Sequence, residues 1–385
     1  MSFSYYSVTR NHPSAPERAR KRSVLKRISS SLKIIAVNFL IFGVLFEFLC
    51  LIYINVTNWP SSKPTYHVNY NSFIADINPV FGVWHRPNSH FYHQGGCFSA
   101  EYTTNSYGAR DVERSLHSSE PRTIVLGDSM IEGLGLADQD RLTNLLEKRT
   151  DREYLNFGTQ DFGPLQYALL YKSLASQFDH DTVLVAVLPH NDFLDMSPEW
   201  GKAYYPDRYR PYYADDFSIY YTGHVHPNAG EGFWDHVEAV LRAYLASYHV
   251  GQFLYSKWYW RRAGPYSGYN DFTEVDLARL KRALEDIKST ADAHHSRMAV
   301  ILIPVTNDFQ RLHGSNANRL GPEIVHWGQD NRVPVKDLLP DMDALSAGNY
   351  HSLFFSCNGH WSRRGSEVAA EVLQPWLTQL NAVAK

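Results

Sequence analysis

Short, almost continuous apolar runs recur along the chain from about residue 120 onward. They predict strands at residues 122–126, 153–157, 182–188, 298–304 and 333–335. The first, third and fourth runs contain few polar positions, which is typical of strands covered on both faces of a sheet. The longer stretches between the runs have helical character. Strands that alternate with helices in this way predict an α/β fold with a doubly wound, mostly parallel five-stranded sheet.

The clearest predicted helix starts at Thr273. Asp276 lies three residues later, where it can complete a capping box with the threonine. The apolar residues that follow share one face of the helix: Leu277, Leu280, Leu284 and Ile287. A terminal helix is expected at about residues 363–380. Ligand sites of such folds open at the carboxyl ends of the strands. We therefore look for catalytic and binding residues in the segments that follow the strands.

A longer apolar run precedes all of these elements. Residues 34–55 contain no Lys or Arg and are interrupted by Asn38 and Glu47. At about 1.5 Å rise per residue, a helix of this length just spans a hydrocarbon core of about 30 Å. We therefore expect one transmembrane helix. A cleaved signal peptide is the competing interpretation, but the run is too long and no Ala-x-Ala-like site follows it.

Charge is distributed unevenly around this run. Residues 1–33 hold eight Lys or Arg and a single acid, Glu17, whereas the 29 basic and 39 acidic residues after Lys33 give a net charge of −10. By the positive-inside rule, the N-terminal tail is cytoplasmic and the main body is extracytoplasmic, periplasmic or at the cell surface, with Trp59 at the interface. The acidic balance of the main body argues against nucleic acid as its partner.

Glu47 and the three cysteines add to this topology. We expect Glu47 to lie near enough to the outer end of the span to reach water or be protonated; contact with a partner membrane protein is the alternative. Cys50 lies in the span. Cys97 and Cys357 remain, a pair that could form one disulfide in an oxidising compartment.

These patterns divide the chain into four parts. They are a basic cytoplasmic tail (1–33), a transmembrane helix (34–55), a linker with an N-terminal elaboration (56–115) and an α/β domain (116–385). An insertion at residues 196–271 follows the third strand and is crowded with aromatic residues, whose amphipathic rings suit stacking on sugar faces. For Tyr255, Trp258 and Tyr259, at helical spacing, we expect packing instead. For the tyrosines in loops both interpretations stay open: Tyr204, Tyr205, Tyr209, Tyr212, Tyr213, Tyr220 and Tyr221.

Polar segments follow three of the strands and precede the last helix. They are Gly127-Asp128-Ser129, the loop from Asn156 to Gln166, Pro189-His190-Asn191-Asp192, and Cys357-Asn358-Gly359-His360-Trp361. Ser129 would stand near a helix start, where free N–H groups and the positive dipole end favour a developing oxyanion. Each segment alone has an ordinary explanation as a cap, a turn or a buried histidine. All four in this order indicate a catalytic site.

This order of segments resembles the SGNH hydrolases, also called the GDSL family, over roughly residues 80–380. The resemblance implies a three-layer, flavodoxin-like domain. It implies that Ser129 is the nucleophile, that His360 is the base and that the side chain of Asn191 helps to bind the oxyanion. The Gly-His-Trp setting of His360 is similar to that of a membrane-anchored, envelope-facing branch, and so is Tyr107-Gly-Ala-Arg110-Asp111 before the first strand.

Two positions depart from the family pattern. The second block usually has Asn-x-Gly-x-x-Gly, and its second glycine gives an N–H to the oxyanion hole. Here that position is Asp161, whose N–H survives but whose carboxylate would oppose an oxyanion unless it points away or is paired. The branch usually has Asp two residues before the histidine, where this chain has Asn358. An Asn can hold the ring through His360 Nδ1–H but cannot stabilise the imidazolium by charge.

The sequence therefore predicts acyl transfer. His360 takes the proton from Ser129 as it attacks an ester, and the N–H groups of Ser129 and Asp161, with the Asn191 side chain, receive the oxyanion. No metal or cofactor is required, and the scattered histidines form no convincing ligand set: His224, His226, His294 and His295.

Two functions follow as expectations. The first is a membrane-anchored serine ester hydrolase or acyltransferase that acts on an acylated extracytoplasmic glycan, with acetyl as the acyl group. The alternative is a catalytically impaired SGNH fold that binds glycan or serves as a scaffold in an envelope polysaccharide assembly.

Overall fold

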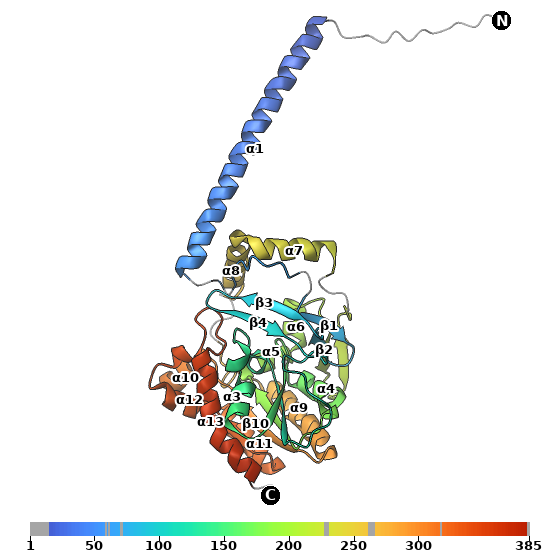
Figure 1. Cartoon of the computed structure of the whole chain (residues 1–385), viewed down its shortest axis with the longest axis vertical. Helices are drawn as coiled ribbons and strands as arrows, with labels where there is room; N and C mark the ends of the chain where they lie inside the picture. Colours follow the sequence, from blue (N-terminus) through green and yellow to red (C-terminus); the bar gives the residue numbers. More distant parts are fainter. Residues whose placement is uncertain are drawn as a thin grey trace, which may run out of the picture. The chain divides into compact units, whose positions relative to one another are not determined.

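The computed structural model describes residues 15–57, 60, 62–69, 72–226, 231–260, 266–315 and 318–382. The chain divides into two compact units, Met1–Tyr53 and Ile54–Lys385. Helix α1, Ala15–Thr57, dominates the first unit (Figure 1). Its part from Lys26 to Thr57 is long and apolar enough to cross a membrane, and the predicted span 34–55 lies within it. The predicted position of Trp59 at the interface lies outside the described residues.

The second unit is built on a five-stranded parallel sheet with the order β11-β10-β7-β5-β6. Its strands are β5 (Arg122–Gly127), β6 (Glu153–Gly158), β7 (Thr182–Val187), β10 (Arg297–Leu302) and β11 (Val335–Asp337). Numbered along the chain this is the order 2-1-3-4-5 of flavodoxin-like folds, which confirms the predicted fold class. The winding direction reverses between β5 and β7, and ligands bind beside such a reversal.

The last strand was predicted two residues too early. Val333 donates its N–H to the carbonyl of Gly328, which closes the preceding helix, and Pro334 has no N–H to offer to a neighbouring strand. The carbonyl of Pro334 does accept from Val300. Pairing with β10 therefore begins at Val335, and the strand is Val335–Asp337 instead of 333–335.

Helices cover both faces of the sheet. On one face α4 (Pro164–Ser173) packs against α9 (Glu274–Ala293), and on the other α3 (Leu142–Arg149) packs against α13 (Arg363–Ala382) (Figure 1). Right-handed crossovers require this arrangement, because the connection from β5 to β6 winds in the opposite direction to the two that follow. The shorter helices are α2 (Ser129–Glu132), α5 (Pro189–Asp195), α10 (Thr306–Ser315), α11 (Leu320–Asn331) and α12 (Leu339–Ser346), with 3₁₀ turns η1 (Asp138–Asp140), η2 (Ala175–Gln177) and η3 (Tyr350–Leu353).

The capping box predicted at the start of α9 is present. Thr273 Oγ1 accepts a hydrogen bond from the N–H of Asp276 at 3.2 Å, and Asp276 Oδ2 accepts one from the N–H of Thr273 at 2.9 Å. The predicted apolar face of the helix, Leu277, Leu280, Leu284 and Ile287, is buried in the core. The reciprocal bonds satisfy two N–H groups that a helix start otherwise leaves without partners.

Three antiparallel hairpins and further helices are added to the sheet, before β5 and after β7. Before β5 lie β1 (Ile74–Asn78) with β2 (Gly82–His85), and β3 (His90–Gln94) with β4 (Ser99–Thr103). The insertion after β7 forms α6 (Pro198–Tyr204), β8 (Arg210–Tyr213) paired with β9 (Ile219–Thr222), α7 (Phe233–Tyr244) and α8 (Ala246–Trp260). These elements add residues that the five-stranded sheet and its covering helices do not supply.

The aromatic residues of the insertion fall into two groups. Tyr212 and Tyr213 are buried, whereas Tyr220 and Tyr221 are partly exposed. The packing predicted for Tyr255 and Trp258 is wrong, because their side chains are 66% and 57% exposed. Helical spacing identified the shared face of these two residues but not whether protein covers that face. The side chain of Tyr259 lies outside the described part of the structure.

Candidate active site

Ser129 stands at the carboxyl end of β5, where the winding direction of the sheet reverses. Asp128 caps the short helix α2, and its Oδ1 accepts a hydrogen bond from the N–H of Met130 at 3.0 Å. Ser129 is the first residue of that helix and is only 3% exposed. Its hydroxyl therefore sits at a helix start, beside amide groups whose N–H bonds point away from the helix body.

His360 comes to Ser129 from the other end of the chain. The distance from Ser129 Oγ to His360 Nε2 is 2.8 Å, a normal hydrogen bond. The loop before α13 is closed by a bond from the N–H of Phe355 to the carbonyl of His360, and by a bridge between Phe354 and Trp361. Trp361 is 1% exposed, so the residue after the histidine is anchored in the core.

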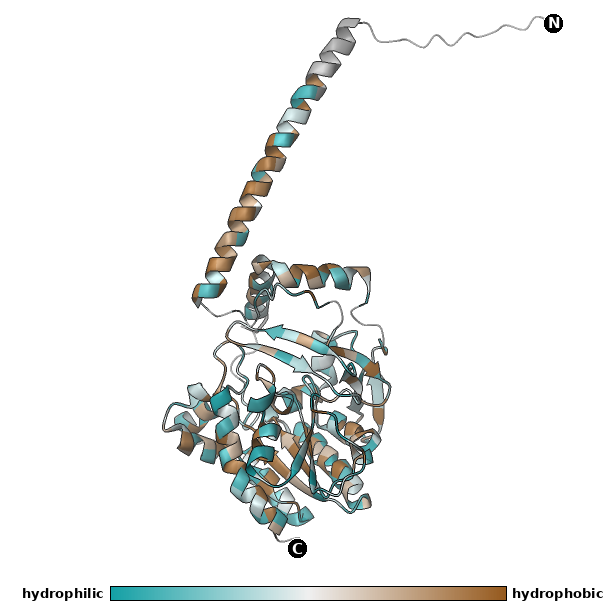
Figure 2. Ribbon diagram, in the orientation of Figure 1, coloured by the Kyte–Doolittle hydropathy of each residue, from teal (hydrophilic) through white to brown (hydrophobic). Residues whose placement is uncertain are grey.

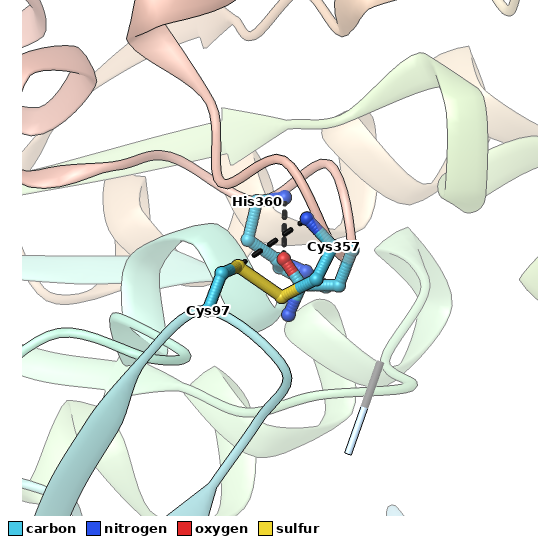
Figure 3. Close-up of a disulfide and its surroundings, with 4 residues drawn as sticks. Cys97, Cys357 and His360 are labelled. Atoms are coloured by element: carbon cyan, nitrogen blue, oxygen red, sulfur yellow. Dashed lines mark hydrogen bonds between the residues drawn. A yellow bond between two sulfur atoms is a disulfide. The ribbon is translucent and has the colours of Figure 1, made fainter. Parts of the chain in front are cut away.

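A disulfide also holds the His360 loop. Cys97 and Cys357, the pair that the sequence allowed to bond, are joined across 260 residues with their Cα atoms 5.8 Å apart (Figure 3). Cys97 lies in the turn between β3 and β4, and the ring of Phe98 packs on that of Phe355 with centroids 5.1 Å apart. The tip of the β3–β4 hairpin is thus a covalent and apolar support for the loop that carries His360.

Asn358 does not orient the imidazole in the way predicted from its position. Its Oδ1 accepts from the backbone N–H of His360 at 3.2 Å, and His360 Nδ1 is buried without a hydrogen-bond partner in the described part of the chain. An Asx-type bond to the residue two positions later is the common local choice of an asparagine side chain. The side-chain amide of Asn358 thus stabilises the loop backbone. It does not stabilise the His360 tautomer that carries its proton on Nδ1 and leaves Nε2 free to accept from Ser129.

Burial keeps His360 neutral. Removal of the imidazolium from water is the largest effect and lowers the pKa of His360 to about 4, against smaller opposing contributions from the charges of Glu132 and Asp161. Burial also raises the pKa of Asp128 to about 7, and the nearby Asp195 adds to this effect. The histidine is thus a neutral acceptor at neutral pH, but a weak one.

Three groups were predicted to bind the oxyanion: the N–H groups of Ser129 and Asp161 and the side chain of Asn191. In the part of the chain that the structure describes, the backbone N–H groups of Ser129 and Asp161 donate no hydrogen bond. The side chain of Asn191, in the first turn of α5, donates to Asp128 Oδ2 at 3.4 Å, and Ser129 Oγ lies 3.5 Å from the same oxygen. Asp192 instead caps its own turn, since it accepts from the N–H of Leu188 at 2.8 Å.

Asp161 occupies a glycine-like conformation and its carboxylate is paired. Its φ is +63°, in the left-handed region that Asp tolerates better than most residues. Asp161 Oδ2 accepts from Arg208 at 2.7 Å, and its carbonyl accepts from Arg210. More than forty residues separate these arginines of the insertion from Asp161, so their contact with the loop after β6, residues 159–163, which we call the oxyanion loop, could not be predicted from the sequence. The negative charge of Asp161, which was predicted to oppose an oxyanion, is therefore balanced by Arg208 of the insertion.

Glu132 is a second residue that sequence reasoning missed. It is fully buried, its Oε2 accepts from the N–H of Gln160 at 2.6 Å, and its Oε1 lies 3.6 Å from His85 Nε2. Hydrogen bonding and the charges of His85 and Arg110 outweigh burial and lower the pKa of Glu132. An ionised Glu132 therefore fixes the residue immediately before Asp161. The only sequence signal was an acid three residues after the serine.

Gly158 and Arg110 complete the support of this loop. A Cβ on Gly158 would lie 2.4 Å from the backbone nitrogen of Glu132, so glycine lets the loop after β6 approach α2. Arg110, from the segment that resembles the envelope-facing branch, is fully buried and donates to the carbonyls of Gly133 and Leu136, each at 2.7 Å. Both residues support the C-terminal end of α2.

Pairing of Asp161 with Arg208 leads to a prediction. Arg208→Ala leaves a carboxylate without its cation beside the oxyanion hole, and we expect kcat/KM for an aryl acetate to fall about tenfold. Asp161→Gly alone should stay within about threefold of wild type, because glycine keeps the N–H and suits a positive φ. The double variant should recover the activity that Arg208→Ala loses. A double variant as slow as Arg208→Ala would show that the arginine acts by another route.

A cavity of about 470 Å³ lies beside the oxyanion loop. Gln160 and Arg208 line it, whereas Ser129 and His360 do not. Its wall combines the rings of Phe91, Tyr92 and Tyr102 with polar side chains that include Asn69 and Glu238. Aromatic faces with hydrogen-bonding groups between them suit a small polar molecule with apolar faces, and the volume is within the range of ligand sites. Among the described residues, no group of three His, Cys, Asp or Glu could hold a metal ion.

Comparisons with known proteins give a likeness to solved structures alone. No family model and no curated protein matches the sequence. The structure is similar to a GDSL-like lipase from Bacteroides thetaiotaomicron (8% identity, 69% of this chain and 93% of that chain, TM-score 0.37). It is also similar to a member of the lipolytic protein G-D-S-L family from Veillonella parvula (10% identity, 65% and 94% covered, TM-score 0.37). At such identities and TM-scores, the catalytic chemistry rests on this chain's own residues.

Proposed function

We propose that this protein is a membrane-anchored serine ester hydrolase or acyltransferase of the SGNH kind. The observation that carries the proposal is the 2.8 Å contact between Ser129 Oγ and His360 Nε2 at the carboxyl end of β5. A buried nucleophile and a neutral base within hydrogen-bond distance, at the topological switch point of a doubly wound sheet, form the minimum for acyl-enzyme chemistry.

The reaction proceeds through the groups already described. Ser129 Oγ attacks the ester carbonyl while its proton moves to His360 Nε2, and the carbonyl oxygen becomes an oxyanion. The N–H groups of Ser129 and Asp161 and the amide of Asn191 stabilise that charge. The ester C–O bond then breaks, and His360 returns the proton to the departing alcohol. Water, or a sugar hydroxyl in the transferase case, attacks the acyl-enzyme, and the serine is regenerated.

The substrate class is proposed from location and from the cavity. The apolar length of α1, the basic residues that precede it and the Cys97–Cys357 disulfide support a catalytic domain in an oxidising, extracytoplasmic compartment. The aromatic and polar wall of the cavity beside Gln160 suits a sugar ring. We propose an acylated, O-acetylated envelope or exported glycan as the substrate. Hydrolysis and transfer use the same residues and differ only in the acceptor that reaches the acyl-enzyme.

One observation favours a second candidate function. Among the residues that the structure describes, His360 Nδ1 is buried without a hydrogen-bond partner, and none of these residues supports the correct tautomer or the imidazolium through that atom. Loss of that support in a serine protease costs about 10⁴ in turnover. A site with this defect would suit a glycan-binding or scaffolding component of an envelope polysaccharide assembly.

Turnover of an aryl acetate by the full chain in detergent separates the two functions. The enzyme hypothesis expects hydrolysis above the uncatalysed rate and covalent labelling of Ser129 by a fluorophosphonate probe. Labelling should disappear in Ser129→Ala and in His360→Ala. If the wild type is neither labelled nor active, yet a glycan binds to the purified chain, the scaffold function is correct and the hydrolase is not.

The pH dependence of kcat/KM should carry the signature of the buried histidine. His360 accepts a proton only while neutral, and burial lowers its pKa to about 4, so activity should persist as pH falls and be lost through about pH 4. A carboxylate at position 358 favours the imidazolium. Asn358→Asp should therefore move this acid limb to higher pH and raise the plateau about tenfold. A wild-type limb near the ordinary histidine value, or one that does not move in the variant, would contradict the assignment.

A further inference from the structure

Helix α7 displays its apolar side chains to the outside of the protein. Phe233 and Trp234 are 73% and 76% exposed, and Tyr244 is 49% exposed. Val240 and Leu241 are exposed as well. Phe233 and Trp234 each lie seven residues, about two turns, before Val240 and Leu241, and Tyr244 follows these two after four and three residues. The five side chains therefore share one face of the helix. Figure 2 shows apolar residues along the length of α7.

The opposite face of α7 carries small and charged residues, and its charged side chains also reach solvent, with Glu238 49% and Arg242 56% exposed. Asp235, Glu238 and Arg242 line the 470 Å³ cavity beside the oxyanion loop, and Ala239 and Ala243 fill the space between them. Ala243 is 2% exposed. A surface helix of a globular protein normally turns its apolar face to the core and its charges to water. In α7 the rings of Phe233 and Trp234, 73% and 76% exposed, are more exposed than the charged Glu238 and Arg242, which indicates that these rings have an apolar partner outside the protein.

The chain segment after the membrane-length helix is attached to the same region. Ser62 Oγ lies 2.7 Å from His249 Nδ1 of α8, and the N–H of Tyr66 donates to the carbonyl of Ala243 of α7 at 2.9 Å. Only residues 58–61 separate Ser62 from Thr57, the last residue of α1. Five extended residues reach at most about 18 Å. The start of α8 and the end of α7 are therefore kept close to the point at which the chain leaves the membrane-length helix.

We propose that α7 lies in the outer interface of the membrane that α1 crosses, with Phe233, Trp234 and Leu241 among the lipids. The proposal rests on the membrane anchoring of the proposed function. Trp and Tyr rings favour the level of the lipid headgroups, and an amphipathic helix in this plane buries its apolar face there. Leu254 of α8, 57% exposed, extends the apolar surface.

The charge composition of α7 indicates that its membrane affinity comes from burial of apolar side chains and not from attraction to anionic lipids. The helix carries Asp235, Glu238 and Arg242 and no Lys, so it lacks the basic face that attracts anionic lipids. Binding should thus occur on phosphatidylcholine and change little with salt. The consequence for catalysis is geometric: α7 is the wall between the lipid surface and the cavity beside Gln160. The enzyme is then held with its cavity against the membrane instead of swinging freely on a tether.

Spin labels on the full chain in phosphatidylcholine liposomes test the proposal. In a Cys50→Ser background with the disulfide intact, labels are placed at Trp234→Cys and Leu241→Cys, and at Glu285→Cys on the exposed side of α9 as a control. Accessibility is compared for oxygen, which concentrates in lipid, and for a water-soluble nickel complex. We expect the oxygen-to-nickel ratio at 234 and 241 to exceed that at 285 about tenfold.

Three other results would each overturn the proposal. Equal ratios at all three sites would place α7 in water. Exclusion of both reagents from 234 and 241 would mean that a protein partner or a second copy covers the face, and a second copy would also cause dipolar broadening between labels. Failure of the chain to float with the liposomes would remove the anchoring itself.

A charge variant separates this proposal from the proposed catalysis. In Phe233→Asp/Trp234→Asp, the label at 241 should become accessible to nickel, while turnover of a soluble aryl acetate stays within twofold because neither side chain faces the cavity. If 234 and 241 contact lipid but the chain shows no Ser129-dependent turnover, the proposed hydrolase is wrong and the membrane contact of α7 is correct. If the chain shows Ser129-dependent turnover but the labels on α7 are in water, the hydrolase is correct and the membrane contact is wrong.

Discussion

Ser129→Ala is expected to reduce aryl acetate hydrolysis by about 10³-fold or more, and His360→Ala by a similar factor. Removal of a nucleophile or its base costs up to about 10⁶ in an intact triad. The loss here starts from a lower rate, because His360 Nδ1 has no hydrogen-bond partner within the described part of the chain. The double variant should be no slower than either single one, since the two residues act as a unit through the contact between Oγ and Nε2.

The controls for this prediction exclude unfolding and contaminating esterases. Ser119 is exposed and its side chain forms no hydrogen bond with the described residues, so Ser119→Ala should match wild type. Ser129→Ala should unfold at the same denaturant concentration as wild type, since it loses only a hydroxyl. Activity of Ser129→Ala within tenfold of wild type would remove the serine from the mechanism.

The four short segments identified residues that the structure brings together, for a physical reason. Parallel strands of a doubly wound sheet end at one edge, so residues after β5 and β7 meet whatever the sequence distance between them. This rule placed Ser129 and Asn191 correctly near one another, with both within 3.5 Å of Asp128 Oδ2. The sheet itself was predicted from apolar runs that are buried on both faces.

The features that the sequence could not provide depend on side-chain direction or on distant insertions. Asn358 has two acceptable hydrogen-bond partners, and only the loop geometry shows that it chooses the backbone N–H of His360. Arg208 contacts Asp161 because the insertion folds back over the loop after β6. Whether an apolar helix face is covered depends on all other elements, which is why the exposure of Tyr255 and Trp258 was not foreseen.

Loss of the disulfide should have the largest effect on stability. Cys97→Ser/Cys357→Ser opens a cross-link that spans 260 residues and restricts the unfolded chain. In the chain-entropy account such a link contributes about 5 to 6 kcal/mol, slightly above measured values, which reach about 5 kcal/mol, so we expect a loss of about 4 to 5 kcal/mol. Urea unfolding of the full chain in detergent, followed by tryptophan fluorescence, should shift to lower urea by a corresponding amount. Cys50→Ser is the matched control and should leave the transition unchanged.

The same variant should also lose activity under conditions in which it remains folded. The disulfide ties the loop of His360 to the β3–β4 hairpin, and the contacts that remain without it include the backbone bond from Phe355 and the buried Trp361. A base that drifts by about 1 Å from its nucleophile costs about 10²-fold in rate. Two results would contradict these predictions. If the free energy of unfolding of the double variant stays within about 1 kcal/mol of wild type, the stability prediction is wrong. If the variant is destabilised but turns over normally, the activity prediction is wrong, and Trp361 and the loop backbone suffice to place His360 against Ser129.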